Sequence, residues 1–471
     1  MSNLIESKFK LDDPAVVIYN KKKEDYIKVP PAGGTDSRLN TNGDINFEVE
    51  NQQSFLYLPK SFLHCEFSLY KDDTFKTPLP NTDEITLEHN FFPKLFDQIR
   101  LDVGAYNVET MTNNPGIIDT MLRFVITSNE DKFGSQIKGW FPDTGSGNFV
   151  STLEDSANAA AAAPTKAEFD SAVDNLNKVV TRLNLNKKNT GYTNRKELYS
   201  DPSNTYEVDW ELWPLFGYMD YDKISYQMKY TLVLHRYINN ESIFFGATGT
   251  KAYLKINKLQ FWIPHITPSL EIATMVTKRL NSDKPIPVNY LKRISRTYNF
   301  ESDEVSWHIA RVRTSPRYLF LAFQPADPPS FEENNSLFFL RDNKRKVGGK
   351  TVIDEINSLQ VLINQTLYPL YPLKINIGSK NIFSEGFEAY VEMCKNFGTS
   401  PQLNPKDWRD LYPIFCFDLS SQSEDIAKNG CDITIEMEKN RSDLKLKAHA
   451  VLLVETENKI EVNNGRMVGI Y

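Results

Sequence analysis

The segment that decides the architecture is Leu212–Asp220, which reads LWPLFGYMD, because a similar segment near the end of the chain, Leu411–Leu419, reads LYPIFCFDL. The strand-like stretches after these two segments correspond in the same order, 226–234 to 433–437 and 254–263 to 444–454. Internal similarity of this kind is the signature of a repeated structural unit. The sequence therefore predicts two related β domains in one chain.

The first domain contains an insertion. Upstream of the repeated segments, 59–63 resembles 316–320 and 99–108 resembles 359–367, so the first half holds about sixty extra residues after these stretches. A run of alanines ends at Ala163, and Thr165 with Glu168 forms a capping box for a helix whose apolar stripe ends at Leu183. We predict a helical insertion over about 142–200, with Asn184–Asn194 as a polar exit loop.

The rest of the chain is rich in strand patterns. Apolar and polar residues alternate, as in antiparallel sandwich strands with one face in a core, at 45–49, 63–69, 433–437 and 444–452. Two apolar runs, 318–323 and 411–417, predict strands covered on both faces. Only 117–124 and 385–394 have a helical pattern outside the insertion, and they follow equivalent strands. A chain of 471 residues exceeds the size of one hydrophobic core, which agrees with two domains.

The charge balance argues against a protein that coats nucleic acid. The formal net charge is −7, whereas phosphate binding needs a concentrated basic surface. The basic runs are interpreted as solvated loops, and they are Lys21–Lys23, Lys292–Arg296 and Arg341–Lys350. No stretch approaches the ~18 consecutive apolar residues of a membrane span, and Met1–Pro14 lacks the apolar core of a secretory signal. Four scattered cysteines indicate a reducing compartment.

Local spacing assembles no catalytic or metal-binding constellation. The histidines do not stand at metal-site spacings, and they are His64, His89, His235, His265, His308 and His449. His64 and His449 lie on the polar side of alternating strands, so both are expected to face solvent. Glu436 and Glu438 share one strand face, for which a solvated surface is preferred over a glycosidase pair. Gly246–Lys251 departs from the spacing of a phosphate loop and predicts a hairpin turn. We predict no catalytic residue, no cofactor and no metal.

Several stretches carry a family resemblance. In the second half they are Leu359–Asn364 with Tyr368-Pro369, the helical Glu388–Tyr390, Pro413–Ser420, and Asp432–Glu438 with the last strand. In the first half they are Leu87–Asn90 and Leu259–Pro264 before Pro268. Together, over roughly 46–454, the chain resembles double jelly-roll major capsid proteins, in particular the Polinton/Maverick and adintovirus-like group. The resemblance implies an all-β fold of two side-by-side eight-stranded jelly rolls, with the helical insertion in the first.

The resemblance also implies a structural role. In that family three chains form a trimer of pseudo-sixfold outline, trimers tile an icosahedral shell, and a separate single jelly-roll protein commonly fills the vertices. We therefore expect a homotrimeric major capsid protein of a DNA virus, surrounded by neighbouring capsomers. It would reside in the virion after synthesis inside the host cell. It would make no specific contact with nucleic acid and catalyse no reaction; whether a membrane lies beneath the shell is left open.

The resemblance and the repeats together give expected domain limits. They are an N-terminal arm over 1–44, a first jelly roll over 45–267, a linker and start of the second domain over 268–304, a second jelly roll over 305–456, and a C-terminal tail over 457–471. The arm, which contains Pro30-Pro31 and Gly33-Gly34, is expected to order only against a neighbour or the capsid floor. The main alternative function is a carbohydrate-binding or carbohydrate-processing β-sandwich protein. A receptor-binding fibre is less compatible, because fibrous repeats are missing from the sequence.

Overall fold

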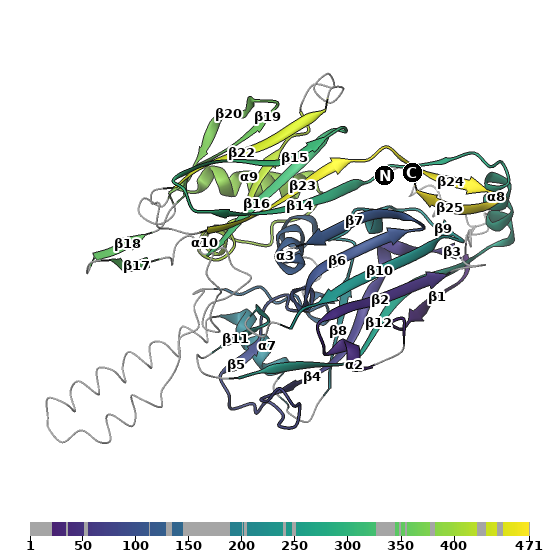
Figure 1. Ribbon diagram of the computed structural model, residues 1–471, viewed down its shortest axis with the longest axis horizontal. Coiled ribbons are helices and arrows are strands. Elements are labelled where there is room, and N and C mark those ends of the chain that lie inside the picture. The colour runs from purple at the N-terminus through teal and green to yellow at the C-terminus, as the bar shows by residue number, and fades with distance from the viewer. Residues whose placement is uncertain are drawn as a thin grey trace, which may run out of the picture.

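The protein consists of two jelly rolls that lie one above the other in Figure 1, with helix α3 (Pro115–Ile126) between them. The computed structural model describes residues 21–33, 36–50, 55–112, 114–128, 134–144, 189–199, 201, 205–238, 242–246, 251–325, 344–347, 350–353, 356–376, 382–421, 430–439 and 446–470. The predicted double jelly roll is confirmed by the strand order of both units.

The first jelly roll packs two antiparallel sheets face to face. One sheet has, in spatial order, β1 (Lys21–Val29), β12 (Tyr253–Pro268), β4 (Phe62–Tyr70) and β8 (Tyr206–Glu211). In the same sheet β3 (Phe55–Leu56) also pairs with β12, and β9 (Ser225–Tyr226) pairs with β3. The other sheet has β2 (Gly43–Glu50), β10 (Lys229–Arg236), β6 (Phe96–Val103) and β7 (Tyr106–Thr112). The alternating apolar residues meet between the sheets, where the rings of Phe47 and Phe261 are 6.2 Å apart. The short strands β5 (Ile85–Leu87) and β11 (Phe244–Gly246) pair separately.

The second jelly roll repeats this arrangement. One sheet has β14 (Leu291–Phe300), β23 (Leu446–Glu455), β16 (Pro316–Pro325) and β21 (Phe415–Asp418) in spatial order. The other has β15 (Glu304–Val312), β22 (Cys431–Lys439), β19 (Ile356–Ile363) and β20 (Thr366–Lys374). A hairpin of β17 (Lys344–Val347) and β18 (Lys350–Ile353) projects from it. If the short strands β3, β5, β17 and β18 are not counted, β1 and β14 are the first strands of the two units, and β7 and β20 are the fifth. These two pairs of strands lie at equivalent sheet edges.

The helices that were predicted after equivalent strands are present. Helix α3 follows β7, and α9 (Ser384–Asn396) follows β20. The prediction of only two helical stretches outside the insertion is wrong, because α8 (Leu270–Leu280) has 11 residues and begins at the Ser269 cap. The remaining α-helices of the described residues are shorter, namely α2 (Asp36–Leu39), α4 (Gly134–Ile137), α7 (Thr190–Leu198) and α10 (Pro405–Asp410). Equivalent helices in both units strengthen the conclusion that the units are related.

The two similar segments that suggested two domains do not occupy equivalent positions in the two jelly rolls. Leu212–Asp220 follows strand β8, whereas Leu411–Leu419 contains the corresponding strand β21. The predicted strand over 411–417 is also wrong in its first part, because pairing with β16 begins only at Phe415. The two-domain prediction is correct because the strands downstream of these segments do correspond, β10 to β22 and β12 to β23.

Described segments near both ends of the chain form strands. The arm prediction is wrong for Lys21–Val29, because β1 pairs along β12 of the same chain and completes the first sheet. Within the predicted tail, β24 (Asn458–Asn463) pairs with β25 (Arg466–Ile470) and with β13 (Ile286–Val288). Asn464 and Gly465 connect them with positive φ values of 50° and 71°, which is the type I′ hairpin turn that an Asn-Gly pair favours.

The insertion is described only at its two ends. Its predicted helix over 165–183 lies outside the described residues. The exit loop prediction over Asn184–Asn194 is wrong from Thr190 onward, because α7 begins there and Asn189 caps it by accepting a hydrogen bond from the Tyr192 amide. The ends meet, since the Thr144 and Thr190 hydroxyls are 3.2 Å apart. The insertion therefore leaves and re-enters the first jelly roll at one point.

Candidate functional site

A buried polar arrangement among the described residues joins the two jelly rolls. Glu109 projects from β7 of the first unit and is buried. Its carboxylate accepts hydrogen bonds from the backbone amides of Arg293 on β14 (2.6 Å) and of Tyr218 (3.1 Å). Burial raises the pKa of Glu109, while the Arg293 guanidinium and the backbone amides act against that rise. The carboxylate thus links the fifth strand of one unit to the first strand of the next.

Helix α3 forms the second part of this domain contact. All of its residues are buried, because it packs on β23 and β16 of the second unit as well as on its own domain. The carbonyl groups of its last turn have no hydrogen-bond donors within the helix. Side chains on and after α9 supply these donors. The Tyr390 hydroxyl donates to the Phe124 carbonyl (3.0 Å), and the Thr399 hydroxyl donates to the Val125 carbonyl (2.6 Å). The end of α3 is therefore capped across the domain boundary.

The backbones approach very closely at Gly217. A methyl group added there would lie 1.9 Å from the carbonyl oxygen of Leu291, which precedes Arg293 on β14. Only a hydrogen atom fits at this position, so a glycine is required by packing rather than by its backbone angles. The close approach explains why this part of the quoted sequence contains glycine.

The structure contradicts two sequence interpretations at this contact. Arg293 was assigned to a solvated loop, but it lies on β14 and is buried against the first jelly roll. His449 was expected to face solvent, but it is fully buried, because α3 covers the outer face of β23. Its Nε2 atom is 2.9 Å from the Gln324 side-chain oxygen, and burial lowers its pKa to about 3. When another domain packs on a sheet, residues on the outward, polar face of its strands become buried.

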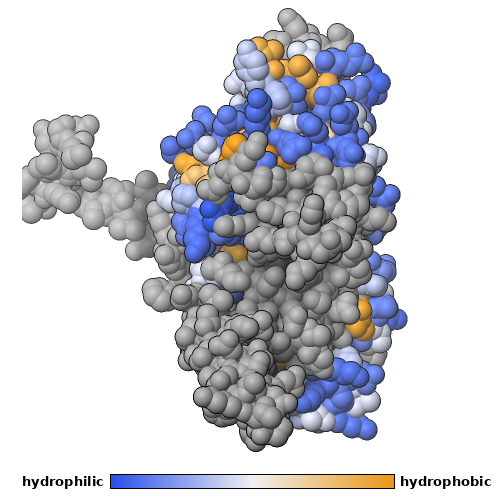
Figure 2. All heavy atoms as spheres, turned by 90° about the vertical axis from the view of Figure 1, so that its left-hand side faces the viewer, coloured by the Kyte–Doolittle hydropathy of each residue, from blue (hydrophilic) through white to orange (hydrophobic). Residues whose placement is uncertain are grey.

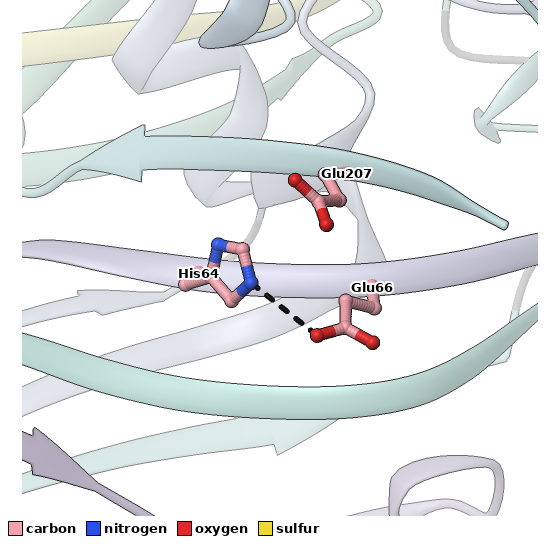
Figure 3. A group of neighbouring side chains, drawn as sticks. All are labelled: His64, Glu66 and Glu207. Atoms are coloured by element: carbon pink, nitrogen blue, oxygen red, sulfur yellow. Dashed lines mark ion pairs between the residues drawn. The ribbon is translucent and has the colours of Figure 1, made fainter.

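His64 was also expected to face solvent, and it is only 8% exposed. It lies on the outer face of β4, where its ring packs on Trp262 and its Nδ1 atom is 2.7 Å from the Asp209 carboxylate. Figure 3 shows its other nitrogen directed toward Glu66, at 3.6 Å, with Glu207 nearby. The ligand atoms of His64, Glu66 and Glu207 lie within 4.8 Å of one another, a spacing that a metal ion can bridge.

A cationic side chain already occupies this group. The Lys258 ammonium is 2.5 Å from Glu66, and this hydrogen bond is the main reason that the pKa of Glu66 is lowered. The three residues therefore fit an ion-pair network on the sheet surface better than a vacant metal centre. The sequence did not indicate Glu207 or Asp209, because neighbouring strands bring them to His64.

The other histidines lie in separate surroundings. His89 is buried, accepts a hydrogen bond from the Phe141 amide, and has a pKa well below its usual value because of burial. His235 is paired with Asp44 at 2.6 Å, which raises its pKa, and His308 lies 3.3 Å from Asp432. His265 lies opposite Asp25 in the pairing of β1 with β12.

Other residues that were considered for chemistry are also separate. Glu436 and Glu438 are exposed on β22, in agreement with a solvated face. Gly246 ends β11, and residues 247–250 of the predicted hairpin turn lie outside the described residues. All four cysteines, Cys65, Cys394, Cys416 and Cys431, are free and buried. Among the described residues, no helix is long and apolar enough to cross a bilayer.

Among the described residues, each jelly roll has an open apolar surface, and α8 also exposes Leu270 and Met275. On β20, Leu367, Leu370 and Tyr371 are 41%, 69% and 78% exposed. Figure 2 shows apolar side chains gathered at the upper end of the molecule, where β19 and β20 lie in Figure 1. The second surface is an aromatic cluster on the outer face of the first jelly roll, in which Phe62 and Trp262 have ring centroids 5.4 Å apart and Tyr26 lies 5.5 Å from Phe62.

The comparisons with known proteins agree with this architecture. The model of a family described as the double jelly roll-like domain matches residues 165–457, more than half of the chain, and this chain therefore belongs to that family. No curated protein sequence matches the chain.

Solved structures share the fold over almost the whole chain. The Faustovirus major capsid protein has a TM-score of 0.54 at 10% identity, covering 98% of this chain and 94% of that chain. A chain in the Sputnik virophage structure gives the same TM-score and identity, with coverages of 98% and 91%. The mavirus major capsid protein gives a TM-score of 0.50 at 10% identity, with coverages of 97% and 91%. At this level of identity the likeness establishes the fold.

Proposed function

We propose that this chain is a major capsid protein that forms homotrimers of pseudo-sixfold outline and tiles an icosahedral viral shell. The observation that best supports this function is the end-to-end likeness, in both jelly rolls and their order, to proteins named as major capsid proteins. The chain would be located in the virion. Its partners would be two further copies in the trimer, neighbouring capsomers and a separate single jelly-roll vertex protein.

The chain has a structural role in this proposal and catalyses no reaction. Its buried ionisable groups, such as Glu109 and the pair of Arg195 and Asp143 (2.8 Å), are used in packing between elements. Glu66 of the His64 group is paired with Lys258, and Glu436 and Glu438 face solvent on one strand. These arrangements support a building block rather than a carbohydrate-processing enzyme, which needs two carboxyls facing each other across a sugar.

The test is the solution mass of the purified protein, measured by multi-angle light scattering at micromolar concentration and physiological salt. We expect the mass of three 54.1 kDa chains, and particles or capsomer arrays in the electron microscope. A monomer across this concentration range would refute the proposal. Hydrolysis of a glycan by the purified protein, lost on replacement of one carboxylate in a variant that still folds, would establish the carbohydrate enzyme instead.

A further inference from the structure

The contact between the two jelly rolls of one chain is a template for the contact between two copies of the chain. We propose that β20 and α9 of one copy dock on β1 and the aromatic cluster of Tyr26, Phe62 and Trp262 in the next copy. The inference rests on the proposed trimer and specifies its interface. The occupant is a second copy of this chain, because the chain already contains the same contact once.

The internal contact has a defined polarity. The fifth strand of the first unit, β7, lies against the first strand of the second unit, β14, and the helix after the fifth strand, α3, lies on β23 and β16. It joins different surfaces of the two units and is therefore heterologous. A heterologous contact that is repeated by rotation closes into a ring. Repeating it once more brings β20 and α9 against β1, β12 and β4 of another copy.

The surfaces that this repetition brings together are among those left open in the described part of the single chain. β7 is covered by β14, whereas its equivalent β20 exposes Leu370 and Tyr371. Every residue of α3 is buried, whereas only four residues of α9 are. The outer face of β23 and β16 is covered by α3, whereas the equivalent face of the first unit leaves Tyr26 exposed beside half-buried Phe62 and Trp262. Each open surface thus has an occupied equivalent inside the chain.

The composition of β20 favours side-chain packing over addition of a strand. Pro369 and Pro372 lack amide hydrogens, so a neighbouring strand cannot form a regular ladder along this edge. The internal equivalent has the same character, because β7 and β14 belong to different sheets and are linked through the Glu109 side chain. A group of exposed apolar residues at such an edge indicates an interaction surface.

Parts of the two surfaces carry opposite charges. The exposed residues of α9 include Glu385, Glu388 and Glu392, which recur on one helical face. On β1 the exposed residues include Lys22 and Lys28, and the Lys28 ammonium lies 3.9 Å from the centre of the Trp262 ring. The opposite charge is confined to these lysines of β1, because Glu24, Asp209 and Glu211 are the charged groups that act on Tyr26. Opposite charges at such a rim favour this orientation over contact between two equivalent edges.

The first test places a photo-reactive residue, p-benzoylphenylalanine, at Tyr371 and irradiates the purified full-length protein. We expect a cross-linked product of twice the chain mass whose peptides join β20 to 21–29 or to the strands that carry Phe62 and Trp262. Cross-links to α8 or to β20 of the other copy would overturn the inference. In that case the trimer proposal would survive if light scattering still reports three chains. A wild-type monomer would remove both proposals.

The second test weakens the interface from each side. The variant carrying Leu370→Lys with Tyr371→Lys and the variant Tyr26→Glu should each dissociate roughly 100-fold more readily, because each places a charge in a desolvated contact. The matched control is Leu270→Lys with Met275→Lys, which changes equally exposed apolar residues on α8. It should leave the trimer intact. Trimers of unchanged stability in both interface variants, with circular dichroism showing folded protein, would overturn the inference.

Discussion

Replacement of Glu109 by alanine should loosen the contact between the two jelly rolls. The carboxylate is buried and accepts two backbone hydrogen bonds, at 2.6 and 3.1 Å, so the substitution leaves two buried amides without an acceptor. Each such amide costs about 1–3 kcal/mol, and loss of a buried charge from beside Arg293 costs about 3–5 kcal/mol. These contributions overlap, and desolvation of the carboxylate, which raises its pKa, opposes them. We therefore expect the free energy of unfolding to fall by about 3 kcal/mol.

The assay is differential scanning calorimetry of the purified protein. A loss of about 3 kcal/mol corresponds to a Tm lower by roughly 6–12 °C for a unit of this size. The variant Glu109→Gln, which retains one acceptor oxygen, should fall between the alanine variant and the wild type. The control Glu48→Ala removes an exposed carboxylate 3.7 Å from Lys229 and should change the stability by less than about 0.5 kcal/mol. A Glu109→Ala protein that unfolds within about 1 °C of the wild type would refute this account of the domain contact.

Three further predictions concern other parts of the structure. His449 has a folded-state pKa of about 3, below its ordinary value of 6.5. Its contribution to the free energy of unfolding is therefore present above pH 6.5 and is lost as the pH falls, by about 2 kcal/mol between pH 7 and pH 5. Urea unfolding at both pH values should show a smaller loss in His449→Gln, and an equal loss would contradict the assignment. Gly217→Ala should abolish soluble protein or lower the Tm strongly, whereas Gly469→Ala, which meets no atom within 4 Å, should be neutral in thermal unfolding. Deletion of 151–188 with a short Gly/Ser link should leave soluble, folded protein by circular dichroism, because Thr144 and Thr190 are already in contact; insoluble protein would show that the deleted segment is needed.

Local patterns in the sequence were sufficient for the class of fold. Alternation of apolar and polar residues at 63–69 and 433–437 predicts strands, because successive side chains of a strand point to opposite faces of the sheet. The helices after β7 and β20 follow from apolar spacing in the same way. The Asn464-Gly465 turn was also predictable from the sequence, since this pair adopts positive φ values at little cost. Recognising this turn would have predicted a β-hairpin where the sequence analysis placed a tail. All these features depend on residues a few positions apart.

The tertiary structure alone decided which polar residues are buried and which elements meet. His449 lies on the polar side of its strand and is buried nevertheless, because α3, far away in the sequence, covers that side. Glu109 is a single acidic residue in a strand pattern, and only the position of β14 gives it two backbone partners. The sequence determined local geometry because backbone sterics and side-chain periodicity act within a few residues. The contacts between jelly rolls depend on how two finished surfaces fit, and no local pattern records that fit.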